Sequence, residues 1–303
     1  MKTKLLLPII FLFVLVFTAC KEGKSSIERT ETSRVFTDAL GDTVKVNTTN
    51  PKVMALSPAL TEMLFAVLPD SQILAVSQAC NYPEAVKTKK RINTYPLDIE
   101  GLIAIKPEVV FYEEGFISAE SISQLRRFGI QTFAFRYNKV VDVFSSIKQI
   151  GTICGQPVKA ENLAKSLQNQ ADSLLIFNPK PLKTLAIISA QPVYVFGKGT
   201  ILSEIIEKVG GTNVVDSAYG RYPEIQREAL LKMNPEVILG GSFSELDSAL
   251  FSKYPELKAI TAYQNKQCYP LTSDLVSRPS PRIVEAMKEV KKALELAKKQ
   301  VDK

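Results

Sequence analysis

Short apolar runs alternate with helix-like spacings of apolar residues along most of the chain. Runs bounded by turn signals predict strands at 52–56, 73–77, 108–112 and 131–135 in the first half, and at 184–189, 193–197, 236–241 and 267–272 in the second. Helical spacing predicts helices at 58–68, 98–105, 119–128, 201–209, 227–233 and 281–299. Because strands alternate with helices, two lobes with parallel-type α/β sheets are expected, the first opening with a hairpin at 35–46.

A continuous helical pattern separates the two halves. Within 158–177, apolar residues recur at helical spacing, at Ala160, Leu163, Ala164, Leu167, Ala171, Leu174 and Leu175. Pro157 can begin this helix, and Pro179 lies beyond its end. At 1.5 Å per residue the pattern predicts a stiff connector of about 30 Å. The expected organisation is an N-terminal lobe over 34–154, a linking helix over 155–179 and a C-terminal lobe over 180–303.

One motif is written in both halves. Ile99–Val110 reads IEGLIAIKPEVV and Arg227–Ile238 reads REALLKMNPEVI, so each copy has a Glu near the start of the predicted helix, then a Leu and a Pro-Glu-Val. A Tyr-Pro precedes each copy, at Tyr95 and at Tyr222. The repeat predicts equivalent helix–strand units in two similar lobes, related by a pseudo-twofold axis with a cleft between them.

The first residues predict export. Lys2 and Lys4 precede an apolar run, Leu5–Phe17, which is too short to span a bilayer as a helix because spanning needs about 20 residues. The run ends before Thr18-Ala19-Cys20, which resembles the lipobox of bacterial lipoproteins. This resemblance implies a signal peptide over 1–19, lipid attachment at Cys20 and a location in the cell envelope, on the periplasmic or extracellular face. An ordinary secretory signal or an uncleaved anchor is the alternative. Residues 20–33 are polar and predict a disordered tether.

Charge and composition disfavour several classes of function. The net charge of +7 is spread over mixed-sign helices such as Lys288–Lys299, and no basic stripe with interleaved aromatic residues predicts a nucleic-acid partner. The chain has no histidine, which excludes Ser-His-Asp and Cys-His catalysis and removes the usual zinc ligand. Besides Cys20 there are Cys80, Cys154 and Cys268, which allow at most one disulfide and have no metal-binding spacing.

Several longer stretches are similar to a known family. They are ALSPALTEMLFAVL from Ala55, NYPEAVK from Asn81, IAIKPEVVF from Ile103, GGTNVVDS from Gly210 and PLTSDLVSRPSPRIVEAM from Pro270. Over 34–299 the chain resembles the bacterial substrate-binding proteins with a helical backbone, which serve importers of cobalamin, iron-siderophores and haem. The resemblance implies the class III fold, with two α/β lobes joined by a single long helix, and a monomer that catalyses no reaction. It further implies a small-molecule ligand in the cleft, no cofactor, and an ABC permease dimer with its ATPase as partner.

Within that family the similarity is strongest to the cobalamin-binding members, so cobalamin or a related corrinoid is the first expected ligand. The resemblance places ligand contacts on Tyr95, Tyr194, Tyr222, Asp274 and Arg278. It places the family's paired docking glutamates, which meet arginines of the two permease subunits, on Glu100 and Glu228. The chain departs from the family in having no tryptophan. Two positions that are aromatic in the family align with Ala79 and Glu113, unless the neighbouring Tyr112 takes the place of the second.

Each of these residues also has a structural interpretation. The tyrosines can pack in loops or, for Tyr194, in a strand, and Asp274 with Arg278 can form an ion pair that shapes its loop. A carboxylate in a first helical turn gains about 0.3–1 kcal/mol from the helix dipole, which explains Glu100 or Glu228 singly. Two at equivalent positions suit a two-subunit permease better. The alternatives for function are a ferric siderophore or haem as ligand, a scavenger that serves another receptor, and, from another class, a chelatase-like enzyme.

Overall fold

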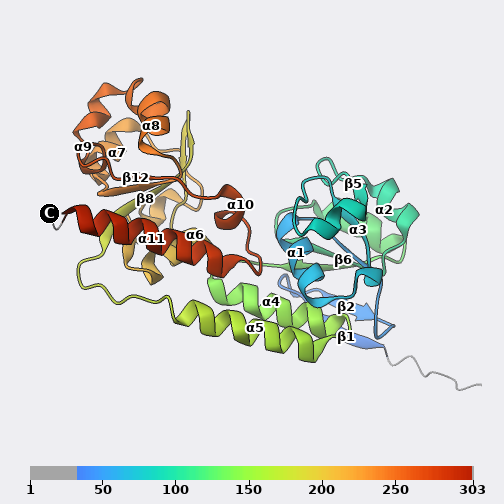
Figure 1. Ribbon diagram of the computed structural model, residues 1–303. Helices are drawn as coiled ribbons and strands as arrows, with labels where there is room; N and C mark the ends of the chain where they lie inside the picture. The colour runs from blue at the N-terminus through green and yellow to red at the C-terminus, as the bar shows by residue number, and fades with distance from the viewer. Residues whose placement is uncertain (1–32, 302–303) are drawn as a thin grey trace, which may run out of the picture. The chain divides into compact units, whose positions relative to one another are not determined.

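The computed structural model describes residues 33–301, which hold two parallel sheets covered by helices (Figure 1). The predicted signal peptide, Cys20 and nearly all of the predicted tether lie outside the described residues. Within 33–301, no helix combines the length and the apolar character that crossing a membrane requires.

The N-terminal lobe is built on a five-stranded sheet in the order β5-β4-β3-β6-β7, with every pair parallel. Its strands are β3 (Val53–Ala55), β4 (Ile73–Ser77), β5 (Lys90–Ile92), β6 (Val109–Glu113) and β7 (Gln131–Phe135), and the predicted hairpin is β1 (Arg34–Thr37) with β2 (Thr43–Val46). Successive strand residues face opposite sides, so Val53 packs with α1 (Pro58–Val67) while Met54 packs with α2 (Ile99–Ile105) and α3 (Ala119–Arg127). The predicted parallel α/β lobe is confirmed.

The C-terminal lobe repeats this plan. Its sheet runs β10-β8-β11-β12, all parallel, with β9 added antiparallel to β8. The strands are β8 (Leu182–Ala190), β9 (Val193–Val195), β10 (Gly211–Asn213), β11 (Val237–Leu239) and β12 (Cys268–Tyr269). The helices are α6 (Ile201–Lys208), α7 (Arg227–Met233), α8 (Phe243–Leu246), α9 (Thr261–Gln264), α10 (Ser273–Val276) and α11 (Ile283–Val301). The order matches β4-β3-β6-β7 of the first lobe, strand for strand, so the predicted duplication is confirmed.

The repeated motif folds in the same way in both lobes. Leu102 of α2 and Leu230 of α7 are the equivalent leucines of the motif, and both are fully buried. Both helices end at a residue in the left-handed region, Lys106 (φ 50°) and Asn234 (φ 43°). The second glutamate of each copy serves the fold: the Glu108 carboxylate accepts a 2.9 Å hydrogen bond from the backbone N–H of Lys52, and the Glu236 carboxylate accepts one of 2.8 Å from that of Lys183.

The predicted connecting helix is present, and a second helix that precedes it in the chain packs along it. α5 (Pro157–Asp172) is the predicted connector, and α4 (Val140–Ile153), which the sequence analysis missed, lies against it (Figure 1). The predicted end at Phe177 is wrong because the chain leaves the helix after Asp172, and the backbone N–H of Ile176 donates to the Lys208 carbonyl of the C-terminal lobe (2.9 Å).

The close approach of α4 and α5 depends on Gly151. A Cβ built there would overlap the Cβ of Ala160 and lie 2.8 Å from the backbone oxygen of Gln156. Glycine therefore lets the two backbones pack without an intervening side chain. The turn between the helices contains Gly155, whose φ of 76° is in the left-handed region.

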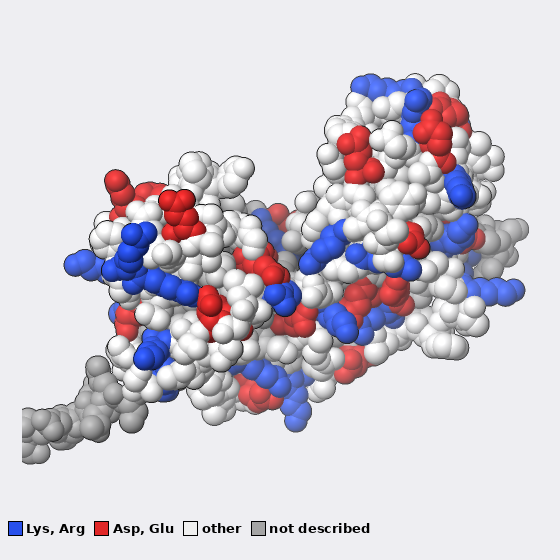
Figure 2. Space-filling model, turned by 180° about the vertical axis from the view of Figure 1, so that it is seen from behind, with Lys and Arg blue, Asp and Glu red and all other residues white. Residues whose placement is uncertain are grey.

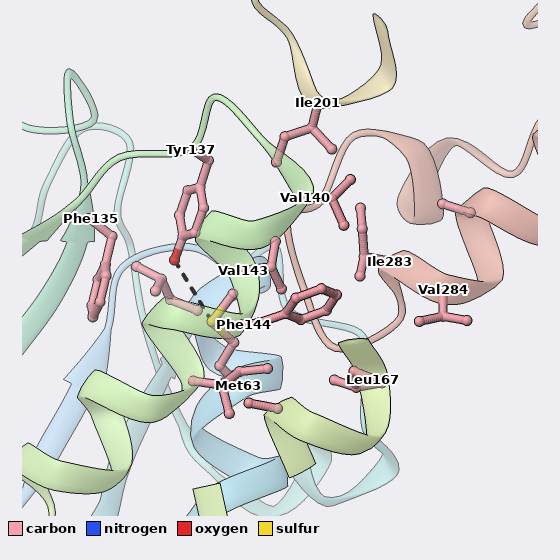
Figure 3. Close-up of a cluster of buried hydrophobic side chains, with 14 of the residues drawn as sticks. Met63, Phe135, Tyr137, Val140, Val143, Phe144, Leu167, Ile201, Ile283 and Val284 are labelled. Atoms are coloured by element: carbon pink, nitrogen blue, oxygen red, sulfur yellow. Dashed lines mark hydrogen bonds between the residues drawn. The ribbon is translucent and has the colours of Figure 1, made fainter. Parts of the chain in front are cut away.

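One hydrophobic core runs through both lobes and through α4 and α5. Buried side chains of a single cluster come from α1, α4, α5, α6 and α11, represented in Figure 3 by Met63, Phe144, Leu167, Ile201 and Val284. The described residues accordingly form one compact unit. Because this packing is continuous, a large opening of the lobes would expose apolar surface to water, which is unfavourable.

The three cysteines of the described chain are all free and buried. Burial raises the pKa of the Cys154 thiol and of the Cys268 thiol to about 12. No disulfide forms among Cys80, Cys154 and Cys268.

Candidate ligand-binding cleft between the lobes

A cleft of about 520 Å³ lies where the carboxyl ends of the two sheets meet. Ligands of open parallel α/β sheets bind at this end of the strands. The N-terminal lobe contributes the last residues of β6 and β7 and those that follow them. The C-terminal lobe contributes β8, the segment after β9, the start of α6, the loop before α7, and the end of α10 with the loop that follows. The lining residues are Glu113, Glu114, Phe135, Arg136, Tyr137, Ile188, Phe196, Thr200, Ile201, Leu202, Arg221, Tyr222, Val276, Ser277 and Pro279.

The floor of the cleft is apolar and belongs to the shared core. Phe135, Tyr137 and Ile201 are part of the buried cluster that joins the lobes (Figure 3). Leu202 belongs to the same cluster. The Tyr137 hydroxyl donates to the sulfur of Met63 (3.7 Å) and lies away from water. Burial, with a contribution from the charge of Glu113, raises the pKa of Tyr137 well above its usual value. The floor therefore offers flat hydrocarbon surface and no phenolate.

The C-terminal lobe adds an aromatic wall. The rings of Phe196 and Tyr222 meet edge to face, with centroids 6.0 Å apart and planes at 70°. Tyr222 is 55% exposed and Ile188 is 47% exposed, although both line the cleft. Such exposed, fixed apolar groups are available to cover the face of a ligand.

Charged groups stand at the edge of the cleft. Arg136 makes a two-bonded ion pair with Glu114, its Nη2 lying 2.7 Å from Oε1, and this bonding lowers the pKa of Glu114. Arg221 donates to the Asn138 side chain and to the Tyr137 carbonyl, each at 2.9 Å. Arg221 thus joins the loop before α7 to the segment that follows β7.

Glu113 is the remaining charged residue of the lining, and it ends β6. Its Oε1 accepts a 2.5 Å hydrogen bond from the hydroxyl of Ser57. Burial raises the pKa of Glu113, and the bond from Ser57 opposes that rise. The neighbouring Tyr112 is 1% exposed and does not line the cleft, so the alternative that it takes the place of the family's aromatic residue is wrong. Burial raises the pKa of Tyr112 to about 12.

Of the three tyrosines expected to touch the ligand, Tyr222 lines the cleft, whereas the other two do not contribute to its lining. Tyr95 lies in the loop between β5 and α2 and is 92% exposed. Tyr194 lies on β9, pairs with Glu224 across a β-bridge, and is 38% exposed. Tyr95 and Tyr222 precede equivalent helices, but the structure brings only the second to the cleft.

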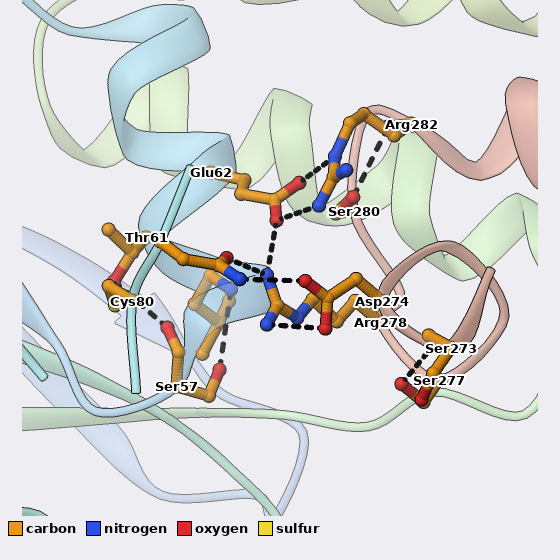
Figure 4. A network of polar contacts seen from close by, with 12 residues as sticks. Ser57, Thr61, Glu62, Cys80, Ser273, Asp274, Ser277, Arg278, Ser280 and Arg282 are labelled. Atoms are coloured by element: carbon orange, nitrogen blue, oxygen red, sulfur yellow. Dashed lines mark hydrogen bonds and ion pairs between the residues drawn. The ribbon is translucent and has the colours of Figure 1, made fainter. Parts of the chain in front are cut away.

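Asp274 and Arg278 lie beside the cleft in a polar network that crosses between the lobes (Figure 4). Arg278 pairs with Asp274 (2.7 Å) and donates to the side chains of Glu62 (3.2 Å) and Asn81 (2.6 Å). Asn81 in turn donates to Asp274 (2.8 Å). Their neighbours Val276, Ser277 and Pro279 line the cleft, so the network fixes the loop that forms part of its wall. Asp274 and Arg278 thus form the loop-shaping ion pair that was the alternative to ligand contact.

Glu62, which the sequence analysis did not single out, is the buried centre of this network. Its side chain is 1% exposed and accepts two bonds from Arg282, of 2.8 Å and 2.5 Å, in addition to the one from Arg278. Arg282, just before α11, also lies over the ring of Tyr82, 4.3 Å from its centroid. A buried carboxylate is tolerated when it is paired and hydrogen-bonded in this way. Glu62 on α1 and two arginines of the C-terminal lobe thus tie the lobes together.

The expected docking residues Glu100 and Glu228 lie in the first turns of α2 and α7, and both are exposed. Within residues 33–301, neither carboxylate makes a hydrogen bond to a side chain or an ion pair. They differ in this from Glu108 and Glu236 of the same motif, whose carboxylates bond to the neighbouring strands.

Several lining residues were missed although a positional signal existed. Arg136 directly follows the parallel strand β7, and the carboxyl ends of parallel strands are where ligands bind. Phe196 follows the antiparallel strand β9, to which this rule does not apply. Arg221 lies in a loop with no periodic signal. Among residues 33–301, no three His, Cys, Asp or Glu side chains are grouped so that they could hold a metal ion.

Two similar parallel α/β lobes, with one cleft lined by both, define a two-lobed ligand-binding protein. The chain belongs to the periplasmic binding protein family, whose model matches residues 53–275. It is a substrate-binding protein of the ABC-importer type, which is a class of transport proteins and not of enzymes.

The chain is similar to known proteins in sequence and in fold. The chain is 25% identical to an uncharacterized ABC transporter substrate-binding lipoprotein, YvrC of Bacillus subtilis, over 90% of this chain and 89% of that protein. It is 23% identical to a vitamin B12-binding protein of Vibrio parahaemolyticus, over 82% and 90%. The periplasmic haem-binding protein HutB of Vibrio cholerae is similar in fold, with a TM-score of 0.70, 23% identity, and coverage of 82% of this chain and 99% of that one.

Proposed function

We propose that the chain captures a corrinoid such as cobalamin in the inter-lobe cleft and delivers it to an ABC permease with its ATPase. The observation that carries this proposal is the composition of the cleft, which has an apolar floor, an aromatic wall and a few polar groups at the edge. A corrin presents broad apolar faces rimmed with amides, and such a cleft is complementary to it. Relatives named as vitamin B12-binding proteins support the choice.

Capture proceeds with little movement of the lobes. The floor residues Phe135 and Ile201 belong to the core that α4 and α5 share with both lobes, and the network around Glu62 ties the lobes beside the cleft. Both features resist separation of the lobes. The ligand therefore enters an open, largely preformed site, and affinity comes from apolar contact with side chains such as Phe196 and Tyr222.

Delivery uses Glu100 and Glu228, one on each lobe. Their exposure, their equivalent places in the motif and the absence of bonding within the described part of the chain support a role in docking. Exposed charges of this kind steer and register a partner that carries opposite charges. Charge reversal of both, Glu100→Arg with Glu228→Arg, should abolish uptake while ligand affinity stays near that of the wild type.

A matched control reverses two other exposed helical glutamates, Glu120→Arg with Glu207→Arg, one on each lobe. Uptake should persist in this control, because neither glutamate lies in the repeated motif. Normal uptake by the Glu100/Glu228 double variant would rule out the docking role.

Membrane attachment through Cys20 completes the proposal. A lipid-modified Cys20 would hold the binding unit at the outer surface of the membrane through the segment that follows it. Cys20→Ser should move the protein from the membrane fraction to the soluble fraction of the envelope. Retention of the variant in the membrane would favour an uncleaved anchor instead.

Haem is the second candidate ligand, and a specific observation favours it. Arg136 and Arg221 both line the cleft and could pair with two carboxylates by exchanging their bonds to Glu114 and Asn138, and the phenol of Tyr222 is a group that can bind iron. Titration of the chain from residue 21, followed by absorbance and calorimetry, separates the candidates. Binding of cyanocobalamin supports the proposal, whereas binding of haem or a ferric siderophore without cyanocobalamin overturns the ligand and keeps the class.

A further inference from the structure

Glu113 is a partly buried carboxylate of the cleft lining whose bonding within the protein is incomplete. Oε1 is bonded to Ser57, whereas Oε2 has no hydrogen-bond partner among residues 33–301. Two other buried or partly buried glutamates use both oxygens: Glu62 bonds to two arginines, and Glu108 bonds to the Thr48 hydroxyl and a backbone N–H. Glu204 likewise bonds to Lys208 and to the backbone N–H of Val140. Glu236 bonds through one oxygen only, but it does not line the cleft.

The hydrogen bond from Ser57 has a fixed direction. Ser57 caps α1, and its Oγ accepts from the backbone N–H of Leu60 (3.3 Å). The single hydroxyl hydrogen is therefore directed to Glu113, whose Oε1 acts as an acceptor. This arrangement orients the carboxyl plane at the end of β6 and leaves the second oxygen to the cleft.

The nearby cations do not satisfy this oxygen. Arg136 is engaged by Glu114, and Arg221 is engaged by Asn138 and the Tyr137 carbonyl. Within residues 33–301, Oε2 of Glu113 is not one of the buried side-chain atoms without a partner, so it is accessible in the cleft. A ligand that covers the cleft desolvates this oxygen, which is costly unless a further donor bonds to it. Since the protein supplies none among the described residues, the donor is expected from the ligand.

We propose that Glu113 is a specificity-determining residue which accepts a hydrogen bond from an uncharged N–H donor of the ligand, such as a primary amide, and rejects a carboxylate at that place. The inference rests on the proposed function, since the amides on a corrin rim are such donors and the carboxylates of haem are not. A site built to bond one polar group discriminates strongly against an analogue that lacks it.

The main experiment measures the affinity of cyanocobalamin for the wild type and for Glu113→Gln by calorimetry. A hydrogen bond to a charged group corresponds to a loss of roughly tenfold to hundredfold in affinity when the charge is removed. Exposed Glu120→Gln is the matched control and should bind as the wild type does. Equal affinities of wild type and Glu113→Gln would overturn the proposal.

The same variants are titrated with haem, which separates this inference from the choice of ligand. Removing the negative charge should tighten haem binding several-fold, because a carboxylate then no longer faces Glu113. If haem binds the wild type and cyanocobalamin does not, the proposed ligand fails. The inference still stands if Glu113→Gln tightens haem binding, and it fails if haem affinity is unchanged or weakened.

A ligand-free measurement decides the case in which neither compound binds. If Glu113 serves a ligand and not the fold, the melting temperature of ligand-free Glu113→Gln should equal or exceed that of the wild type at pH 7. A residue that serves binding at the expense of stability can be replaced without lowering the melting temperature. A clearly lower melting temperature would assign Glu113 to the fold and overturn the proposal.

Discussion

Replacing the buried Glu62 by glutamine tests how the lobes are held together. The carboxylate is 1% exposed and accepts three arginine bonds, two from Arg282 and one from Arg278. Glutamine keeps the shape but removes the negative charge, which leaves two guanidinium groups without their shared partner. Removing one member of a buried ion pair costs about 3–5 kcal/mol.

The structure places the expected cost at or just below the lower limit of that range. The arginine side chains are 13% and 16% exposed, so both reach some water. Arg278 also keeps its bonds to Asp274 and Asn81. Glu62→Gln should therefore lower the free energy of unfolding by about 2–3 kcal/mol.

Urea unfolding followed by circular dichroism measures this change. The midpoint should fall while the slope with urea stays constant, since the surface exposed on unfolding is the same. Glu161→Gln is the control, because the exposed Glu161–Lys148 pair contributes less than about 1 kcal/mol. A loss below about 1 kcal/mol for Glu62→Gln would refute the reasoning that this network ties the lobes together.

Four further outcomes follow from the structure. Tyr222→Ala should weaken cyanocobalamin binding by tenfold or more in calorimetry, because the aromatic wall loses its exposed ring. Gly151→Leu should reduce thermal stability strongly, since the added side chain separates α4 from α5, whereas an exposed change such as Ser145→Leu on α4 should not. Burial raises the pKa of Glu113 above its ordinary value of 4.5, so the folded state loses stability as the pH rises from 4.5 through the raised pKa and the carboxyl ionises. Any gain in melting temperature for Glu113→Gln should therefore be larger at pH 7 than at pH 4. Cys154 and Cys268, with pKa values of about 12, should react with a thiol reagent at pH 8 only after unfolding, and rapid labelling of the native chain would contradict their burial.

Local patterns predicted the sheets well because their strands are short, apolar and separated by helices. β4 at 73–77, β7 at 131–135 and α7 at 227–233 have the bounds that the periodicity predicts. α4 was missed although Val140, Val143, Phe144 and Ile147 have helical spacing. α5 was predicted too long because Leu174 and Leu175 continue the helical spacing after Asp172. In the structure Leu174 packs against the shared core from a non-helical segment, whereas Leu175 is exposed.

The site was harder to predict because its residues meet only in three dimensions. Tyr95 and Tyr222 have the same local context, yet only the second lines the cleft, which depends on how each lobe faces the other. The pairing of Glu62 with Arg278 and Arg282 joins segments far apart in the sequence, so no local pattern reveals it. Charge distribution was easier to anticipate: Figure 2 shows Lys and Arg interspersed with Asp and Glu across the face displayed, without a basic stripe on that face.

The shared core has a consequence for the duplicated halves. Duplication commonly leaves two units that can be separated, but here α4 packs against both α1 and α6, and α5 packs against both α1 and α11. Either half expressed alone would expose this apolar surface, so the halves should unfold in one cooperative transition and fail to fold as fragments. The two lobes thus share the same sheet order, but they depend on one hydrophobic core that neither lobe completes alone.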